Sequence, residues 1–315
     1  MKKRVITGIL MALILAPLVF VDILLPILEI FGILFVIIAS IEMINMYEKA
    51  HHTPIGVKII VVFSTLLLYL SLVSSSPFCV DSQLVKILNK INFKIDLILT
   101  LGLIFVLNLS CLVFIPDFDA ADIGRCFLAI IYVALGLGSF VTLRFMGIRF
   151  MVYMILVVMG TDVFALVFGI SFGKHKMAPL ISPKKSWEGA IGGSASALIL
   201  GTAFILLYQN ISKVFPGVEA KSFFEDILDL ESFNPILFIM FILLLTLSMS
   251  ISGQIGDLVA SKLKRSFGIK DYSNIFPGHG GILDRFDSLM YSSVIFLFFL
   301  TMAYNILPYM DIIAQ

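Results

Sequence analysis

The sequence is poor in charged residues. Of its 315 residues only 14% are Asp, Glu, Lys or Arg, whereas 60% are hydrophobic, and the formal net charge is +1. Soluble domains average about 25% charged residues and no more than about 50% apolar ones. A soluble domain of this length could not bury so much apolar surface, and intrinsic disorder requires the opposite composition. The small net charge gives no reason to expect nucleic acid as a partner.

Cysteine is also scarce. The three cysteines, Cys79, Cys111 and Cys126, show no CxxC or CxxH spacing, and two of them lie in apolar stretches. We therefore expect neither a disulfide framework nor a zinc site. The chain has no internal repeat at a fixed period and no low-complexity segment.

Long apolar runs dominate what is present. A membrane-spanning helix needs roughly 20 mostly apolar residues. The runs are apolar on all sides and do not alternate with period two, which disfavours a β-barrel. We expect an all-α, polytopic integral membrane protein with about nine transmembrane helices. The predicted spans are 5–21, 24–44, 56–75, 97–115, 126–143, 150–169, 190–208, 235–252 and 289–307.

The basic residues predict the orientation of these spans. Cytoplasmic segments carry an excess of Lys and Arg, and most of these residues face the cytoplasm when the N-terminus is cytoplasmic and the C-terminus outside. Arg144 and Arg149 fit badly, because this threading places them in a tight outer turn. Residues 1–20 resemble a signal peptide, but no small-residue cleavage site follows, so we interpret them as a retained first helix.

Two segments, 173–193 and 253–288, interrupt the apolar pattern and are predicted to face the cytoplasm together. The positive-inside rule explains their Lys and Arg residues. It does not explain their Gly-rich turns or the four aspartates of the second segment, Asp257, Asp271, Asp284 and Asp287.

In the second segment the spacing brings carboxylates onto shared faces. Asp257, Ser261 and Lys264 are spaced i, i+4 and i+7, and so share one face of a helix. Asp284 and Asp287, at i and i+3, share another. Carboxylate oxygens are ligands that Mg²⁺ prefers, together with water and substrate phosphates.

Glycines and cations accompany these carboxylates. Residues 277–278, Pro-Gly, predict a turn. Gly280 and Gly281 allow backbone N–H groups to approach an anion closely. Such a set is typical of phosphoryl or nucleotidyl transfer; a solvated loop held by internal salt bridges is the alternative. The cations available for phosphates are Lys264, Arg265, Lys270 and Arg285.

The first segment contains a helix start. Ser186 is placed to cap the helix that follows, with Glu188 in its first turn. Lys184 and Lys185, directly before that helix start, would make a seat for an anion. A plain helix cap is the alternative, and the two interpretations are compatible.

Isolated polar residues need separate treatment. Asp162 lies inside a predicted span, and an intramembrane carboxylate is by default a functional hypothesis, although it can also pair with a basic residue. Glu29 and Glu42 are weaker candidates, since Glu42 lies near a helix end and can reach water. His279 can bind phosphate, act as a base or hold its turn; without a second histidine at ligand spacing we do not expect it to bind metal.

Residues 261–287, SKLKRSFGIKDYSNIFPGHGGILDRFD, resemble the signature of the phosphatidate cytidylyltransferase family, also called CDP-diacylglycerol synthases. The resemblance extends to residues 256–257, to 182–189 (SPKKSWEG) and to Asp162 with residues 173–174, and so covers roughly the C-terminal half. Ala260 departs from the pattern, because bacterial relatives often carry Glu at this position.

The resemblance implies a nucleotidyltransferase that converts CTP and phosphatidic acid to CDP-diacylglycerol and pyrophosphate, in phospholipid biosynthesis, with Mg²⁺ as cofactor. A second cation such as K⁺ stays open. It implies metal binding by Asp257, Asp284 and Asp287, with Asp162 either completing the site or pairing with a basic residue. In this hypothesis Lys264, Arg265 and Arg285 neutralise the triphosphate, and Lys184 and Lys185 hold the phosphatidate head group. The other residues expected at the catalytic or substrate site are Ser182, Ser261, Lys270, His279, Gly280 and Gly281.

On this reading residues 1–125 form about four N-terminal membrane helices, and residues 126–315 form the catalytic membrane region. We expect a bacterial cytoplasmic membrane and an active site that faces the cytoplasm. Apolar faces and Gly-rich spans would permit a homodimer.

Two alternatives come from other classes. One is a CTP-dependent lipid kinase or a CDP-alcohol phosphotransferase, although the D-G-x2-A-R-x8-G-x3-D-x3-D run of the latter is absent. The other is a transporter or lipid flippase that uses Asp162 as an ion site, although the paired repeats of transporters are not evident.

Overall fold

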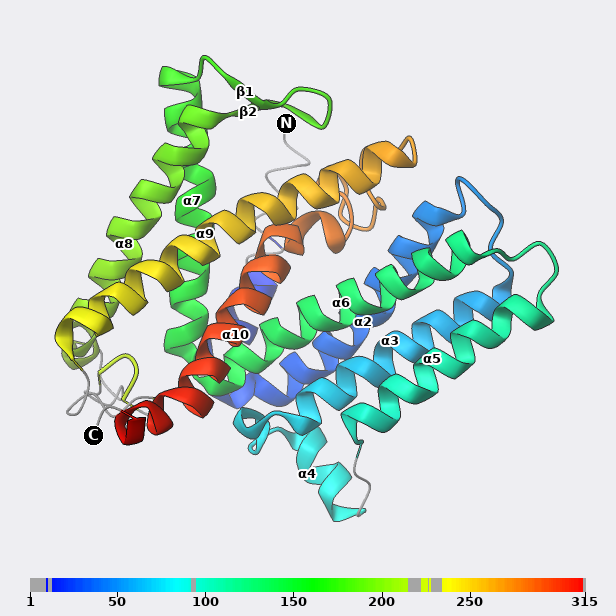
Figure 1. Ribbon diagram of the computed structural model, residues 1–315, viewed down its shortest axis with the longest axis horizontal. Coiled ribbons are helices and arrows are strands. Elements are labelled where there is room, and N and C mark those ends of the chain that lie inside the picture. The colour runs from blue at the N-terminus through cyan, green and yellow to red at the C-terminus, as the bar shows by residue number, and fades with distance from the viewer. Residues whose placement is uncertain are drawn as a thin grey trace. The chain divides into compact units, whose positions relative to one another are not determined.

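The computed structural model describes residues 10, 13–91, 95–214, 222–225, 227 and 234–313 (Figure 1). Its contacts divide the chain into two compact units, and each unit is built from separate stretches of sequence. Unit 1 comprises Met1–Ile148 and Val259–Met290, and unit 2 comprises Arg149–Leu258 and Tyr291–Gln315. The division expected from the sequence, into N-terminal membrane helices up to residue 125 and a catalytic region after it, stays a prediction.

The described residues are almost entirely helical, as the apolar runs predict. The exception is an antiparallel pair of short strands, which the sequence did not indicate. The α-helices are α2 (Leu25–Tyr47), α3 (Ile55–Ser75), α4 (Gln83–Lys90), α5 (Leu97–Phe114), α6 (Ala120–Met146), α7 (Ile148–Phe172), α8 (Trp187–Val214), α9 (Pro235–Ser266) and α10 (Leu283–Ile313). The shorter elements are the 3-10 turns η1 (Asp22–Leu24) and η2 (Pro77–Cys79) and the strands β1 (Lys176–Ala178) and β2 (Ser182–Ser186).

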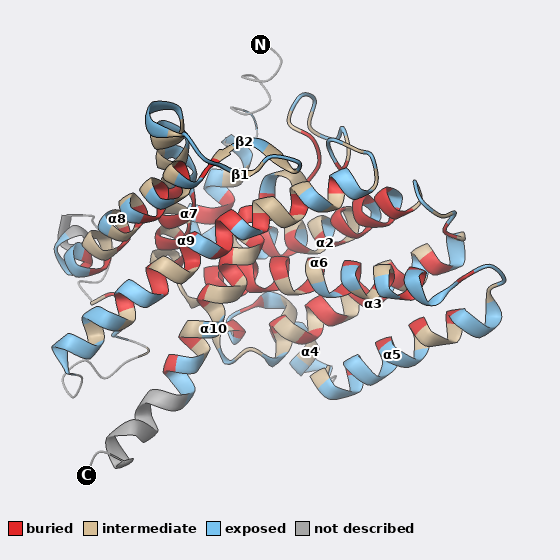
Figure 2. Cartoon of the chain, turned by 45° about the horizontal axis from the view of Figure 1, so that its top comes forward, coloured by how far each residue is buried: buried red, intermediate tan, exposed pale blue. Residues whose placement is uncertain are grey.

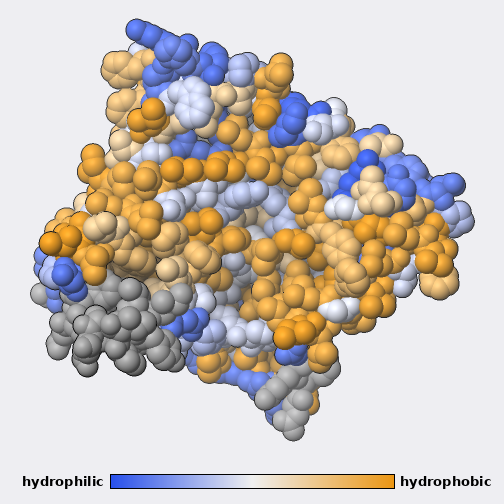
Figure 3. Space-filling view, in the orientation of Figure 1, coloured by the Kyte–Doolittle hydropathy of each residue, from blue (hydrophilic) through white to orange (hydrophobic). Residues whose placement is uncertain are grey.

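Among the described residues, eight helices are long and apolar enough to cross a membrane, and they match eight of the nine predicted spans. Hydrophobic side chains cover much of the face shown in Figure 3, as lipid-facing helices require. Of the remaining predicted span, 5–21, the structure describes residue 10 and residues 13–21.

One boundary is wrong in the sequence-based prediction. The span expected to end near residue 252 continues without a break as α9 to Ser266, so the first part of segment 253–288 is helical, as the spacing of Asp257, Ser261 and Lys264 indicates. The helix ends where Gly268 adopts a φ of +68° and the N–H of Ile269 donates to the carbonyl of Lys264. This is the bonding of a glycine C-cap, which a polar composition does not reveal.

Unit 1 is organised around α6. This helix packs on α2, α3 and α5, and it is buried over most of its length (Figure 2). Buried polar groups satisfy one another: the Asn108 amide on α5 donates to the Ser64 hydroxyl on α3 at 3.2 Å. Such bonds are needed because hydrocarbon supplies no alternative partner.

In unit 2 a chain of polar side chains joins three helices. The Thr161 hydroxyl on α7 donates to Ser250 on α9 at 2.8 Å, and Ser250 donates to Ser194 on α8 at 3.0 Å. The Gln254 amide on α9 also donates to Ser194, at 2.9 Å. This chain sets the rotation of α7 and α9, which carry Asp162 and Asp257.

Arg144, which fitted the predicted threading badly, does not present an exposed charge. Its side chain is 2% exposed, and its guanidinium donates to the carboxylate of Asp22 and to the carbonyl of Val19. Because the charge is paired inside unit 1, Arg144 carries little weight in an orientation rule that counts residues in loops.

The Arg144 pair gives a stability prediction. Asp22→Asn removes the negative partner of a buried guanidinium, and we expect a loss of about 2 kcal/mol in unfolding free energy, typical of a hydrogen bond to a charged group. The matched control is Asp81→Asn, whose pair with Lys86 joins side chains that are 92% and 50% exposed. It should cost about 1 kcal/mol or less. Melting temperatures of the detergent-purified variants measure both; equal shifts would contradict the prediction.

Candidate functional site

The signature loop, residues 267–282 between α9 and α10, belongs to unit 1 and closes on itself. The N–H of Phe276 donates to the carbonyl of Gly280 at 2.9 Å, and the N–H of Gly280 returns the bond at 3.1 Å. Gly278 and Gly280 have φ values of +79° and +84°, which favour glycine. The Pro-Gly turn predicted at 277–278 is therefore present.

Asp284, in the first turn of α10, is the internal anchor of this loop. Its side chain is 3% exposed. One carboxylate oxygen accepts from Lys264 on α9 at 2.6 Å, and the other accepts from the backbone N–H groups of Tyr272 at 2.8 Å and Gly281 at 2.9 Å. A Cβ on Gly280 would collide with this carboxylate. The anion that the glycine turn holds within unit 1 is thus the protein's own.

Glu42 on α2 is a second anchor, although the sequence makes it only a weak candidate for a functional site. Its side chain is buried, with 2% of the residue exposed, and accepts three hydrogen bonds. The donors are the Ser273 hydroxyl at 2.6 Å and the N–H groups of Ile282 and Leu283 at 3.0 Å each. Glu42 therefore caps α10 and secures the loop to α2. The only sequence signal was a carboxylate inside an apolar run.

The remaining predicted residues of unit 1 lie on or beside this loop. Arg265, Lys270 and Arg285 are exposed, and Ser261 and Asp287 are partly exposed. Arg265 donates to the carbonyl of Ile269, and Asp287 accepts from the N–H of Ser288. The Nδ1 atom of His279 is buried and has no hydrogen-bond partner, while its backbone N–H donates to Phe276.

Unit 2 contains the other predicted cluster, built around the β1–β2 hairpin. Lys185 on β2 forms an ion pair with Asp257 on α9, with 2.5 Å between Nζ and Oδ2. The Ser186 hydroxyl accepts from the N–H of Gly189, so the predicted helix cap is confirmed. Glu188 accepts from the N–H groups of Lys174 and His175, which ties the preceding turn to α8.

Lys185, Ser186 and Asp257 line a cavity of about 670 Å³ in unit 2, here called the lysine cavity. Its cations all come from the hairpin, and its carboxylates come from α7 and α9. Positive charge with a neighbouring carboxylate pair suits a phosphate group and a divalent cation together. The charged and polar lining residues are Asp162, Lys176, Lys184, Lys185, Ser186, Gln254 and Asp257.

The predicted site residues thus fall into two groups, one in each unit. Asp162, Ser182, Lys184, Lys185 and Asp257 belong to unit 2, and the others belong to unit 1. Within the described part of each unit, no three His, Cys, Asp or Glu residues gather as a metal site would require. The metal set of Asp257, Asp284, Asp287 and Asp162 stays a prediction.

Comparison with known proteins identifies the family. The model of the cytidylyltransferase family matches residues 2–303, nearly the whole chain. The chain belongs to the cytidylyltransferase family. The resemblance found in the signature stretch is thereby confirmed at the level of the family.

Individual members of the cytidylyltransferase family match a shorter region. A phosphatidate cytidylyltransferase of Staphylococcus haemolyticus is 42% identical over 174 residues, which are 55% of this chain and 57% of that protein. Proteins of the same name from Staphylococcus aureus (strain COL) and Staphylococcus epidermidis (strain RP62A) are 40% and 37% identical over similar shares. The match thus spans little more than half the length of these curated relatives.

The Glu42 anchor gives a prediction about the loop. Glu42→Gln places an amide opposite two N–H donors, and we expect local opening to become easier by about 2 kcal/mol, or roughly 30-fold faster hydrogen exchange at Ile282 and Leu283. The control is Glu29→Gln, because Glu29 is also buried on α2 and accepts two backbone N–H bonds, from Gln83 and Leu84.

We expect both variants to lose protection against hydrogen exchange, but in different segments of the chain. Glu29→Gln should expose amides at the start of α4 and leave residues 267–283 protected. Hydrogen exchange read by mass spectrometry separates the two segments. Unchanged protection of Ile282 and Leu283 in Glu42→Gln would refute the anchoring role.

Proposed function

We propose that this protein is a phosphatidate cytidylyltransferase, which transfers the cytidylyl group of CTP to phosphatidic acid and releases pyrophosphate. The observation that carries the proposal is the match to curated relatives of that name, at 37–42% identity, within a family match that spans the chain. The paired clusters of lysines and aspartates support it, because this reaction brings two anions together.

The chemistry needs cations and positioning more than proton transfer. The phosphate monoester of phosphatidic acid has a second pKa of about 6, so it is already a nucleophile at pH 7. Its oxygen attacks the α-phosphorus of CTP, and the bond to the β-phosphate oxygen breaks to release pyrophosphate. No covalent enzyme intermediate is needed, and stabilisation of the developing charge dominates.

In this proposal the lysine cavity holds the phosphatidate head group. Lys184 is exposed and lines the cavity, and Lys185 is held in place by Asp257. Lys264, Arg265 and Arg285 of unit 1 neutralise the triphosphate. Both arginines are exposed, whereas Lys264 is buried against Asp284.

Magnesium fits the donor set of the lysine cavity. Asp162 and Asp257 both line it, and carboxylate oxygens are the ligands Mg²⁺ prefers. When bound, the ion supplies charge neutralisation for the phosphates. The proposed metal ligands also include Asp284 and Asp287. Asp284 would have to give up its hydrogen bond to Lys264 in order to bind the metal. A second cation such as K⁺ stays part of the proposal.

We also propose that the site faces the cytoplasm, where CTP is available, and that the protein lies in the cytoplasmic membrane. The positive-inside distribution of Lys and Arg supports this orientation. The eight described spans support a multi-pass membrane protein.

The direct test supplies radiolabelled CTP, phosphatidic acid and Mg²⁺ to the detergent-purified protein. We expect label in the lipid phase, lost on chelation and restored by added Mg²⁺. Folded protein that consumes no CTP would contradict the proposal and favour a transporter or flippase. The label of this assay is in the cytidine or the α-phosphate; in a parallel assay with label in the γ-phosphate, labelled lipid would favour a CTP-dependent kinase, because cytidylyl transfer releases that phosphate in pyrophosphate.

Asp284→Asn should abolish turnover while the protein still inserts into the membrane and folds. Because this change also disturbs the Lys264 bond, Asp287→Asn is the second variant, since it leaves the Asp284 contacts in place. We expect at least a 100-fold loss in kcat for each, as for removal of one stabilising group at a transition state. Wild-type turnover by both would exclude Asp284 and Asp287 from the metal set.

The proposed role of Lys184 is tested by the effect of its substitution on KM for phosphatidic acid. Lys184→Gln should raise KM for phosphatidic acid about tenfold, the worth of one charge-assisted hydrogen bond, with KM for CTP unchanged. Lys174→Gln is the control, since Lys174 is exposed in the same segment but does not line the lysine cavity. Equal KM values in the two variants would contradict this assignment.

A further inference from the structure

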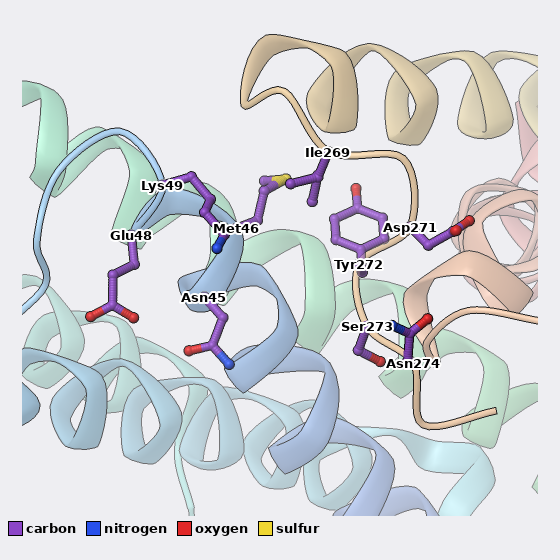
Figure 4. Close-up of a pocket in the computed structure, with 9 residues that line it drawn as sticks. All are labelled: Asn45, Met46, Glu48, Lys49, Ile269, Asp271, Tyr272, Ser273 and Asn274. Carbon is purple, nitrogen blue, oxygen red and sulfur yellow. The ribbon is translucent and has the colours of Figure 1, made fainter. Parts of the chain in front are cut away.

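Unit 2 contains a second hollow, of about 410 Å³, which residues of β1, α8 and α9 line and which is here called the apolar groove. Among the residues that the structure describes, no charged side chain lines it. It differs in this from a cavity of about 560 Å³ in unit 1, which Glu48, Lys49 and Asp271 help to line (Figure 4). A lining without charge offers nothing to a phosphate and favours a hydrocarbon ligand.

The walls of the apolar groove present exposed hydrocarbon. Ile191 on α8 is 67% exposed, and Ile251 and Ile255 on α9 are 45% and 44% exposed. Two polar residues of the lining, Ser194 and Gln254, are buried and bonded to each other at 2.9 Å. Because these polar groups already have partners, the surface that a ligand would meet is mainly apolar.

The apolar groove adjoins the lysine cavity. Met177, Ala190 and Gln254 line both, and the Gln254 amide on α9 donates to the carbonyl of Ala190 on α8 at 3.4 Å. Trp187, the first residue of α8, also lines the groove and is 52% exposed. Tryptophan prefers the membrane–water interface, so the groove begins at that interface and follows α8 into the hydrocarbon. A molecule with an anion at one end and a chain at the other matches this pair of sites.

We propose that the apolar groove binds one acyl chain of phosphatidic acid, and that Ala195 and Leu198 set the length of chain that it accepts. This inference rests on the proposed function, which places the head group in the lysine cavity. Both residues line the groove. At the rise of an α-helix they lie about 7.5 and 12 Å further along α8 than Ala190, where the two sites adjoin. They therefore line the part of the groove that is far from the head group.

The test is competition between phosphatidic acids of different chain length. The detergent-purified protein receives CTP, Mg²⁺ and equal amounts of dioctanoyl and dioleoyl phosphatidic acid, and mass spectrometry gives the ratio of the two lipid products. Ala195→Phe should shift this ratio roughly tenfold toward the shorter chain, because each buried methylene group contributes about fourfold to binding. Leu198→Ala should shift the ratio toward the longer chain, because it lengthens the groove.

Ile199 supplies the matched controls, because it is 71% exposed on α8 and does not line the apolar groove. Ile199→Phe and Ile199→Ala should leave the product ratio unchanged. A mere loss of stability would lower the amount of both products and would not shift their ratio in opposite directions. Wild-type ratios in both groove variants would overturn the inference, whereas the enzyme assignment would stand.

If the wild type forms no product, cross-linking decides. Phosphatidic acid with a diazirine at the end of one acyl chain should label residues 191–198 or 247–255, and Ala195→Phe should reduce this label. A phosphatidylcholine probe with the same chain should label them less, because the lysine cavity favours an anionic head group. Equal labelling by the two probes, or labelling unchanged in Ala195→Phe, would overturn the inference. Absence of label together with a disulfide-linked dimer of Ile191→Cys would assign the groove to a second copy of the chain and also overturn it.

Discussion

The buried carboxylate of Glu42 is the interaction on which the arrangement of unit 1 depends. It accepts three hydrogen bonds from residues more than 200 positions later in the chain, at the end of the signature loop and the start of α10. Leaving a buried carboxylate unpaired would be costly, so the loop and the two helices adopt positions that satisfy it. Gly281 is required at this contact, because any side chain there would meet the Glu42 carboxylate.

Asp284 completes the anchoring from the other side of the loop. Its bonds to Lys264, Tyr272 and Gly281 join the end of α9, the middle of the loop and its last residues. Two buried anions thereby hold the 16-residue loop, together with its buried side chains Tyr272 and Ile282. The arginines and Lys270 stay exposed around it, which leaves them available to phosphates, whereas Lys264 forms an ion pair with Asp284.

In unit 2, polar contacts hold charged groups beside lipid-facing helices. Hydroxyl and amide groups of Thr161, Ser194, Ser250 and Gln254 bond to one another and fix α7, α8 and α9. The hairpin then carries Lys185 to Asp257. Lys185 and Asp257 neutralise each other at this cavity, which lowers the cost of placing these two ionisable residues at membrane helices.

Much of the local structure was predictable, because its causes are local. Apolar runs of about 20 residues predict eight of the described helices, and the Ser186 cap and the Pro-Gly turn at 277–278 follow from residue type. The extension of α9 to Ser266 and the β1–β2 hairpin were missed, since a polar composition is compatible with helix, strand or loop.

Composition and hydropathy predict the class of the protein, its eight described spans and the residue types available for phosphate and metal chemistry. The contacts of the folded chain show that Glu42 and Asp284 hold the signature loop and that Lys185 pairs with Asp257. The hydropathy of a helix depends on consecutive residues, so the sequence alone is enough to predict a membrane span. A hydrogen bond between residues 42 and 283 depends on which helices pack together, and no local pattern encodes that choice.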